Sequence, residues 1–314
     1  MLERRYLMKR VAVLAPLLAL VAGVALAGCT SSPDPAPASA GSTSEAIIVV
    51  ASTTVYGDLA ATVGGDAVEV TSIIDDPNKD PHEYEASAQN QLALSKAQVI
   101  VKNGGGYDDS VDTMLDAAGN DTVTVLDAVE ISGKTAEAGE ELNEHVWYDL
   151  PSVQKVIEEL EAGFAQIDPE QADTFRKNAD ELTAELDALV QREEELQGQY
   201  AGTPVAITEP VPLYLLEAIG LENQTPEAFA EAIEEGTDVP ASVLLETLDL
   251  FSGGQVQLLA YNEQTAGPQT EQVLDAAEQN GVAVVPVTET LPDGDTYVSW
   301  MSGNLDALAD AFAS

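Results

Sequence analysis

The stretch that decides the architecture of this chain is DPEQADTFRKNADELTAELDALVQREEELQGQY, residues 168–200. It opens with Asp168-Pro169-Glu170, an acidic residue followed by proline, which is typical of the start of a helix. Apolar residues then recur at helical spacing, and this predicts one continuous helix of roughly 45 Å at 1.5 Å per residue. A coiled coil is the alternative, but fewer than four heptads and a single stripe favour a packed connecting helix. The stripe consists of Phe175, Ala179, Leu182, Leu186, Leu189 and Leu196.

Short β-branched segments alternate with amphipathic helical patterns on both sides of this helix. Such alternation predicts parallel sheets that are covered on both faces by helices. We therefore expect an α/β protein of two lobes, each a parallel sheet flanked by helices, joined by one long connecting helix. The predicted N-terminal lobe covers 46–167, the connecting helix 168–200 and the C-terminal lobe 201–314.

The predicted strands are residues 47–52, 67–74, 99–102 and 122–126 in the first lobe, and 205–208, 257–261 and 282–287 in the second. The predicted helices are residues 54–64, 86–96, 107–118 and 151–165 before the connecting helix, and 210–219, 225–235, 240–252, 269–280 and 296–313 after it.

The first 45 residues predict where the chain goes in the cell. Basic residues precede an apolar run over 11–27, which ends in Leu26-Ala27-Gly28-Cys29. This order is typical of a secretory signal, and the run is short for a membrane span. The tetrapeptide resembles the signal of bacterial lipoproteins, in which the cysteine is lipidated and becomes the first mature residue. We expect a signal peptide over 1–28, a lipidated Cys29 and a flexible tether over 29–45; a retained helical anchor is the alternative.

Composition limits both the partners and the chemistry. The chain has 55 acidic and 12 basic residues and a formal net charge of −43, so nucleic acid and anionic lipid are poor partners. High acidity also serves solubility or adaptation to salt, and the charge alone therefore names no function. Cys29 is the only cysteine, which leaves the mature chain without a disulfide or a thiolate for a metal. Any metal site must use imidazole and oxygen ligands.

The only two histidines lie in similar clusters, Asp80-Pro81-His82-Glu83-Tyr84 and Asn143-Glu144-His145-Val146-Trp147. Each cluster lies in a loop after a predicted strand, and ligand sites of open parallel sheets lie beyond the carboxyl ends of their strands. Glu209 and Glu289 also follow predicted strands, whereas most other carboxylates fall on helix faces, where a solvated role is the default. We therefore predict a metal site between the lobes, with the ligands His82, His145, Glu209 and Glu289.

These clusters resemble the motifs of the substrate-binding lipoproteins of bacterial zinc and manganese importers of the ATP-binding-cassette class. Residues 80–84 match the first motif, aspartate-proline-histidine with an aromatic residue two positions on. In the second motif Asn143, His145, Trp147 and Asp149 match, while Glu144 replaces a proline and Leu150 separates Asp149 from Pro151. Residues 103–106 are similar to the family's asparagine-glycine turn, and residues 297–305 to its final helix.

The resemblance implies which metal the site binds. Glu209 is similar to the third ligand, which is histidine in zinc-type members and often glutamate in manganese-type members. Glu289 takes the place of the usual aspartate, and Asp293 and Asp295 are alternative fourth ligands. Two imidazoles and two carboxylates suit Mn²⁺ or Fe²⁺, although Zn²⁺ would bind at least as tightly in the Irving–Williams order. The histidine-rich loop of some zinc members is absent from 132–144, which also favours Mn²⁺ over Zn²⁺.

The resemblance also implies a function without a chemical step or a catalytic cofactor. It describes a monomer, held outside the cytoplasm on the cell membrane by its lipid, that captures Mn²⁺ or Zn²⁺ and delivers it to an ABC-type metal permease. Cell adhesion is a further role attached to the family, and these residues neither support nor exclude it. The alternative is an extracellular metal-dependent hydrolase, which would keep an open coordination position beside a general base. Against it, the sequence has no His-Glu-x-x-His helix, and four ligands would complete the metal shell.

Overall fold

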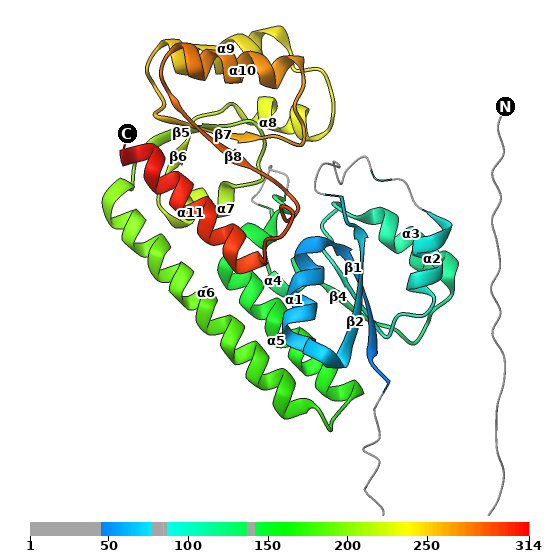
Figure 1. Ribbon diagram of the computed structural model, residues 1–314. Coiled ribbons are helices and arrows are strands. Elements are labelled where there is room, and N and C mark those ends of the chain that lie inside the picture. Colours follow the sequence, from blue (N-terminus) through cyan, green and yellow to red (C-terminus); the bar gives the residue numbers. More distant parts are fainter. Residues whose placement is uncertain (1–44, 77–83, 85–86, 137–141, 314) are drawn as a thin grey trace, which may run out of the picture. The chain divides into compact units, whose positions relative to one another are not determined.

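The computed structural model describes residues 45–76, 84, 87–136 and 142–313. The predicted signal peptide, Cys29, nearly all of the tether and His82 lie outside the described residues. The described part contains two parallel sheets of four strands each, and one long helix links the two lobes (Figure 1). The α/β architecture predicted from the sequence is confirmed. None of the helices in this part of the chain is long and apolar enough to cross a membrane.

The N-terminal lobe contains a sheet of strand order β2-β1-β3-β4, and all of its neighbouring strands are parallel. Both faces of this sheet are covered, because Val49 and Ala51 pack into a core with α1 and α5, whereas Val50 packs with α2 and α3. The elements are β1 (Ile47–Thr53), α1 (Thr54–Gly64), β2 (Val68–Ile74), α2 (Ala88–Leu94), β3 (Val99–Lys102), α3 (Asp109–Ala118), β4 (Thr124–Asp127), α4 (Ala128–Ser132) and α5 (Leu150–Ile167).

The C-terminal lobe repeats this plan with the strand order β6-β5-β7-β8, again all parallel. Val205 and Ile207 pack into the core that includes α7 and α11, whereas Ala206 and Leu259 pack against α8, α9 and α10. The elements are β5 (Pro204–Ile207), α7 (Leu213–Ala218), β6 (Glu222–Asn223), α8 (Glu227–Glu234), α9 (Ala241–Ser252), β7 (Leu258–Asn262), α10 (Pro268–Gln279), β8 (Ala283–Val287) and α11 (Tyr297–Ala313).

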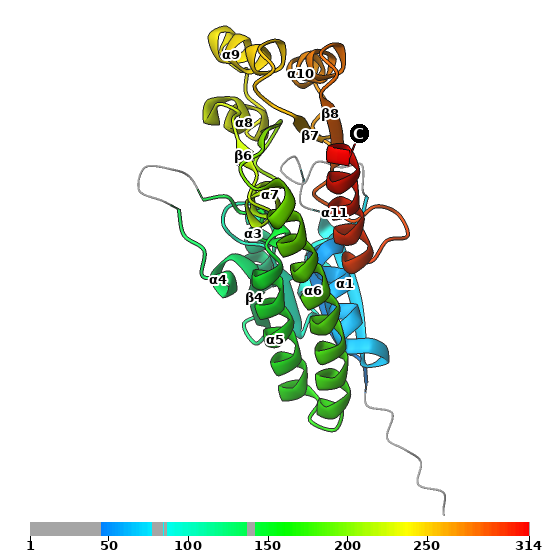
Figure 2. The ribbon, with the colours of Figure 1, turned by 90° about the vertical axis from the view of Figure 1, so that its left-hand side faces the viewer.

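The connecting helix α6 (Ala172–Tyr200) packs against elements of both lobes. Figures 1 and 2 show it beside α5 at one end and beside α11 at the other. Every residue of the predicted apolar stripe is buried, from Phe175 to Leu196. Both lobes therefore pack against the apolar stripe of one helix, as the length and spacing of the stripe predicted.

The start of α6 differs from the prediction. Asp168 does not cap α6 but ends α5, and its carboxylate accepts a hydrogen bond from the backbone N–H of Glu170 at 3.1 Å. The helix itself begins at Ala172. The Asp-Pro pair ends one helix and turns the chain before the next one begins. Residues that are typical of a helix start therefore form, in this protein, the corner between two helices.

The last helix brings the C-terminal lobe back to the N-terminal lobe. The backbone N–H of Tyr297, at the start of α11, donates to the Asp58 carboxylate in α1 at 2.8 Å. The Tyr297 hydroxyl donates to the backbone carbonyl of Trp147 at 2.6 Å. Tyr297 is fully buried, so these bonds fix the loop that contains His145 relative to α1 and α11.

Glu193 is the one charged residue among the buried residues of α6. It lies between Leu189 and Leu196 in the stripe and is 5% exposed. Burial in this apolar surface, and then the nearby Asp149 carboxylate, raise the pKa of Glu193 to about 8. The carboxyl is therefore protonated at neutral pH, and the connecting helix buries a neutral group rather than a charge.

This raised pKa predicts that Glu193 lowers the stability of the protein as the pH rises. The folded state keeps the proton up to about pH 8, whereas an unfolded chain releases it near the ordinary glutamate pKa of 4.5. The free energy of unfolding therefore declines between these values, by about 1.4 kcal/mol for each pH unit at most. We expect Glu193→Gln to remove this part of the decline and to exceed the wild type in stability above about pH 8. Urea unfolding across this range measures the effect.

The control for this measurement is Glu194→Gln, which removes the charge of the exposed neighbour. Its pH dependence should follow that of the wild type. Identical pH profiles for Glu193→Gln and Glu194→Gln would contradict a proton held by Glu193.

Candidate metal centre

His145 is completely buried, and one amide sets its orientation. The Asn143 Oδ1 atom lies 2.8 Å from the His145 Nδ1 atom and also accepts a hydrogen bond from the His145 backbone N–H at 3.1 Å. An amide oxygen only accepts, so Nδ1 carries the proton and the Nε2 atom presents its lone pair. A hydrogen bond of this kind fixes the tautomer of histidine ligands in metal sites.

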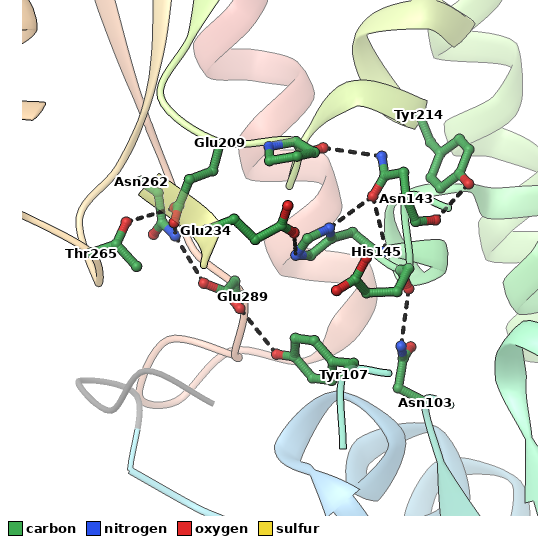
Figure 3. Close-up of polar contacts among 12 residues, drawn as sticks. Asn103, Tyr107, Asn143, His145, Glu209, Tyr214, Glu234, Asn262, Thr265 and Glu289 are labelled. Atoms are coloured by element: carbon green, nitrogen blue, oxygen red, sulfur yellow. Dashed lines mark hydrogen bonds and ion pairs between the residues drawn. The ribbon is translucent and has the colours of Figure 1, made fainter. Parts of the chain in front are cut away.

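The Asn143 loop is also bound to the C-terminal lobe. The Asn143 side-chain amide donates to the Pro210 carbonyl at 3.1 Å, and the Tyr214 hydroxyl donates to the Asn143 carbonyl at 2.7 Å. From the other side, the Asn103 amide donates to the Glu144 carbonyl at 3.0 Å. Asn103 begins the predicted asparagine-glycine turn, so this turn supports the backbone next to His145 (Figure 3).

Two aromatic rings enclose the His145 imidazole. The Trp147 and Tyr107 ring centroids lie 5.0 Å and 5.9 Å from its centroid, both in edge-on geometry. The Tyr107 hydroxyl donates to the Glu289 Oε2 atom at 3.2 Å. Burial, and then the Glu289 carboxylate, hold the pKa of Tyr107 well above its usual range, so this hydroxyl keeps its proton. Tyr107 thus connects the His145 ring to Glu289 of the other lobe.

Glu209 and Glu289 are buried at 2% and 1% exposure and share one hydrogen-bond donor. The Asn262 side-chain amide, at the end of β7, donates to Glu289 Oε1 at 2.9 Å and also to Glu209 Oε2. The Thr265 hydroxyl donates to the same Glu209 oxygen at 2.6 Å. Three strand ends of the C-terminal sheet therefore bring two carboxylates together (Figure 3). These donors are uncharged, and a divalent cation would neutralise both acids.

A third acid reaches His145 from α8. The Glu234 Oε1 atom lies 3.7 Å from the His145 Nε2 atom, and Figure 3 shows the Glu234 carboxylate directed at the imidazole ring. Glu144, His145 and Glu234 each offer one possible ligand atom, and these atoms all lie within 4.8 Å of one another. Within the described residues, this is the one group of three such side chains whose possible ligand atoms lie so close together.

Of the four predicted ligands, the structure describes three. Glu209 and Glu289 lie together through Asn262, and Tyr107 connects Glu289 to the surroundings of His145. His82 lies outside the described residues, so its role stays a prediction. The alternative fourth ligands differ from Glu289, because Asp293 and Asp295 are both exposed. Asp295 instead accepts a hydrogen bond from the Ser299 hydroxyl at 2.8 Å near the start of α11.

Sequence reasoning missed several residues of this centre. Asn262 ends β7, so the strand-end rule that found Glu209 and Glu289 could have found it too. Tyr107 follows the asparagine-glycine turn, which was the available signal. No sequence pattern distinguishes Glu234, because it is one of several acids at the end of a helix. Only the packing of α8 shows its contact with His145.

A family model described as zinc-uptake complex component A, periplasmic, matches residues 49–311 of this chain. The chain belongs to this family. It is therefore a non-catalytic, metal-binding component of a divalent-metal uptake system, and the hydrolase alternative has no support. The resemblance found in the sequence is confirmed.

Individual relatives agree with this assignment. The manganese ABC transporter substrate-binding lipoprotein scaA of Streptococcus gordonii is 26% identical over 325 aligned positions, which cover 95% of this chain and 97% of that protein. The manganese-binding lipoprotein MntA of Bacillus subtilis is 34% identical over 175 residues, about half of each chain. The solved structure of the periplasmic zinc binding protein TroA from Treponema pallidum shares the fold, with a TM-score of 0.72 at 18% identity over 86% of this chain and 100% of that chain.

The shared donor Asn262 leads to a prediction about stability. Asn262→Leu keeps the size of the side chain but leaves both carboxylates without this donor. Since a hydrogen bond to a charged group contributes about 1.5–3 kcal/mol, we expect the free energy of unfolding of the metal-free protein to fall by about 2–5 kcal/mol. Asn280→Leu is the control, because Asn280 is exposed and donates to one backbone carbonyl. Urea unfolding measures both, and equal small losses would contradict the role of Asn262.

Proposed function

We propose that this protein captures Mn²⁺ in preference to Zn²⁺, with Fe²⁺ as a further candidate, and delivers it to an ABC-type metal permease. The proposed ligands are His82, His145, Glu209 and Glu289. The observation that carries this proposal is the burial of His145, Glu209 and Glu289, with Tyr107 packed against the His145 ring and hydrogen-bonded to Glu289, and with Asn262 bonded to both glutamates. Buried acids beside an oriented imidazole match the chemistry of a divalent cation site.

The donor set supports manganese. Two carboxylates and two neutral imidazoles neutralise a divalent charge, and carboxylates that bind through both oxygens exceed the four ligands that zinc prefers. The hydrogen bonds from Thr265 and Asn262 both go to the Oε2 atom of Glu209, so they fix how this carboxylate is presented. The relatives scaA and MntA carry manganese in their names and TroA carries zinc, in line with a site type that accepts both metals.

The cellular arrangement is part of the same proposal. We propose that residues 1–28 are removed, that Cys29 is lipidated and that residues 29–45 tether the metal-binding lobes 46–167 and 201–314 to the cell membrane. The relatives scaA and MntA are described as lipoproteins, which supports this anchor. The protein would meet its permease as a monomer at the membrane surface.

The first prediction of this function is the binding of one divalent metal ion per chain. A ligand that binds only the folded state stabilises it, by about 4 kcal/mol at a thousandfold excess over Kd. We expect Mn²⁺ to raise the Tm of the wild type, and His145→Ala, His82→Ala and Glu289→Ala to lose most of this rise. Asp295→Ala is the matched control at the exposed alternative ligand and should keep it. Stoichiometric binding by both histidine variants would show that the site is misplaced.

A second prediction concerns the choice of metal. Glu209→His replaces a hard oxygen ligand with an imidazole, which suits Zn²⁺ better than Mn²⁺. We expect the ratio of Zn²⁺ to Mn²⁺ affinity to rise by about tenfold or more, a change of about 1.4 kcal/mol. Competition titrations of the wild type and the variant measure this ratio. An unchanged ratio would remove Glu209 from the ligands.

A further inference from the structure

An acidic cavity of about 470 Å³ lies between the Asn143–Glu144 segment and helices α7 and α8. Six glutamates are among its lining residues: Glu144, Glu217, Glu227, Glu231, Glu234 and Glu235. Lys134 is the one basic residue among the described residues that line it. Its ammonium group lies 3.0 Å from the Asp149 carboxylate and 4.1 Å from the centre of the Tyr214 ring, so its charge is already engaged. The potential in this cavity is therefore negative, and divalent cations concentrate there.

Glu234 faces this cavity and His145 at the same time. It lines the cavity with a side chain that is 17% exposed, while its Oε1 atom is buried 3.7 Å from the His145 Nε2 atom. His145 is fully buried and does not line the cavity. The imidazole nitrogen that can bind a metal therefore lies behind the Glu234 carboxylate as seen from the cavity.

Glu144 completes this arrangement from the N-terminal lobe. One ligand atom each of Glu144, His145 and Glu234 lie within 4.8 Å of one another, and both glutamates line the cavity. A cation that moves from the cavity towards His145 would thus meet two carboxylates beside the imidazole.

We propose that Glu234 is the entry ligand of this protein, the carboxylate that receives a divalent metal from the acidic cavity and passes it to His145. This inference rests on the proposed function, because it assumes that His145 binds the metal. It goes beyond that function by adding a residue that acts in the path of the metal and does not belong to the final ligand set of His82, His145, Glu209 and Glu289.

An entry ligand has a kinetic signature that differs from that of a final ligand. It stabilises the metal on its way in and, by microscopic reversibility, on its way out. Its removal therefore lowers both the association and the dissociation rate constants, and Kd weakens by a smaller factor than the association rate constant falls. A final ligand behaves differently, since its removal raises the dissociation rate constant and weakens Kd.

The test is stopped-flow mixing of the intact metal-free protein with MnCl₂, and of the Mn²⁺-loaded protein with excess chelator. The Trp147 ring lies 5.0 Å from the His145 ring, so tryptophan fluorescence reports metal arrival directly. The variant is Glu234→Gln, which keeps the shape of the side chain and removes its charge. The charge-matched control is Glu235→Gln, which removes the next charge on the same cavity wall but not the contact with His145. Thermal unfolding of the metal-free variants confirms that both are folded.

We expect Glu234→Gln to lower the association rate constant by about tenfold, within the range by which local charge changes association rates, and to lower the dissociation rate constant by a smaller factor, because the lost charge 3.7 Å from the His145 Nε2 atom also weakens Kd. Glu235→Gln should change either rate constant by less than about twofold. The proposal is overturned if Glu234→Gln binds Mn²⁺ at the wild-type rate, if its effect equals that of Glu235→Gln, or if it raises only the dissociation rate constant. If the wild type itself binds no Mn²⁺, the proposed function fails first, and these two failures are thereby distinguished.

Discussion

Two carboxylates buried beside one amide set the main electrostatic constraint on this molecule. Taking an ionised carboxylate out of water costs several kcal/mol, and placing a second one close to it adds repulsion. The Asn262, Thr265 and Tyr107 side chains reduce this cost by donating hydrogen bonds to Glu209 and Glu289, but they bring no positive charge. A divalent cation brings that charge. Holding the two carboxylates together therefore increases the free energy gained when metal binds.

The position of these carboxylates depends on contacts that cross from one lobe to the other. The Tyr148 hydroxyl donates to the Thr288 carbonyl at 2.8 Å, directly before Glu289, and the backbone N–H of Leu291 donates to the Thr54 hydroxyl at 3.2 Å. Together with the bonds of Tyr297 and with α6, which packs against both lobes, these contacts hold the strand ends at a fixed separation. A large rotation between the lobes would break several of these hydrogen bonds at once. Metal access by small movements of side chains at the edge of the site requires no such loss.

Most features that depend on local sequence patterns were predicted correctly, whereas features that depend on contacts between distant residues were not. Alternation of strands and helices is a local pattern, so the two sheets and the stripe of α6 could be predicted, and the strand-end rule located Glu209 and Glu289 because parallel strands finish at one edge. The N-terminus of α6 was predicted wrongly, because Asp168 and Pro169 serve equally well as a corner between helices. Glu234 could not be predicted at all, since its contact with His145 joins residues far apart in sequence through the packing of α8.

Selectivity among divalent metals must come from geometry rather than from charge. The formal charge of −43 attracts every cation alike, and the Irving–Williams order places Zn²⁺ above Mn²⁺ at any fixed set of ligands. What a protein can vary is how many oxygens it presents and how firmly it holds them. Here Asn143 fixes the His145 ring, and Asn262 with Thr265 fixes one oxygen of Glu209. If these side chains are the ligands, they cannot close around a smaller ion into a tetrahedral shell without losing these hydrogen bonds. With the proposed ligand set, the cost of that loss would fall on Zn²⁺ more than on a metal that accepts a wider, oxygen-rich shell.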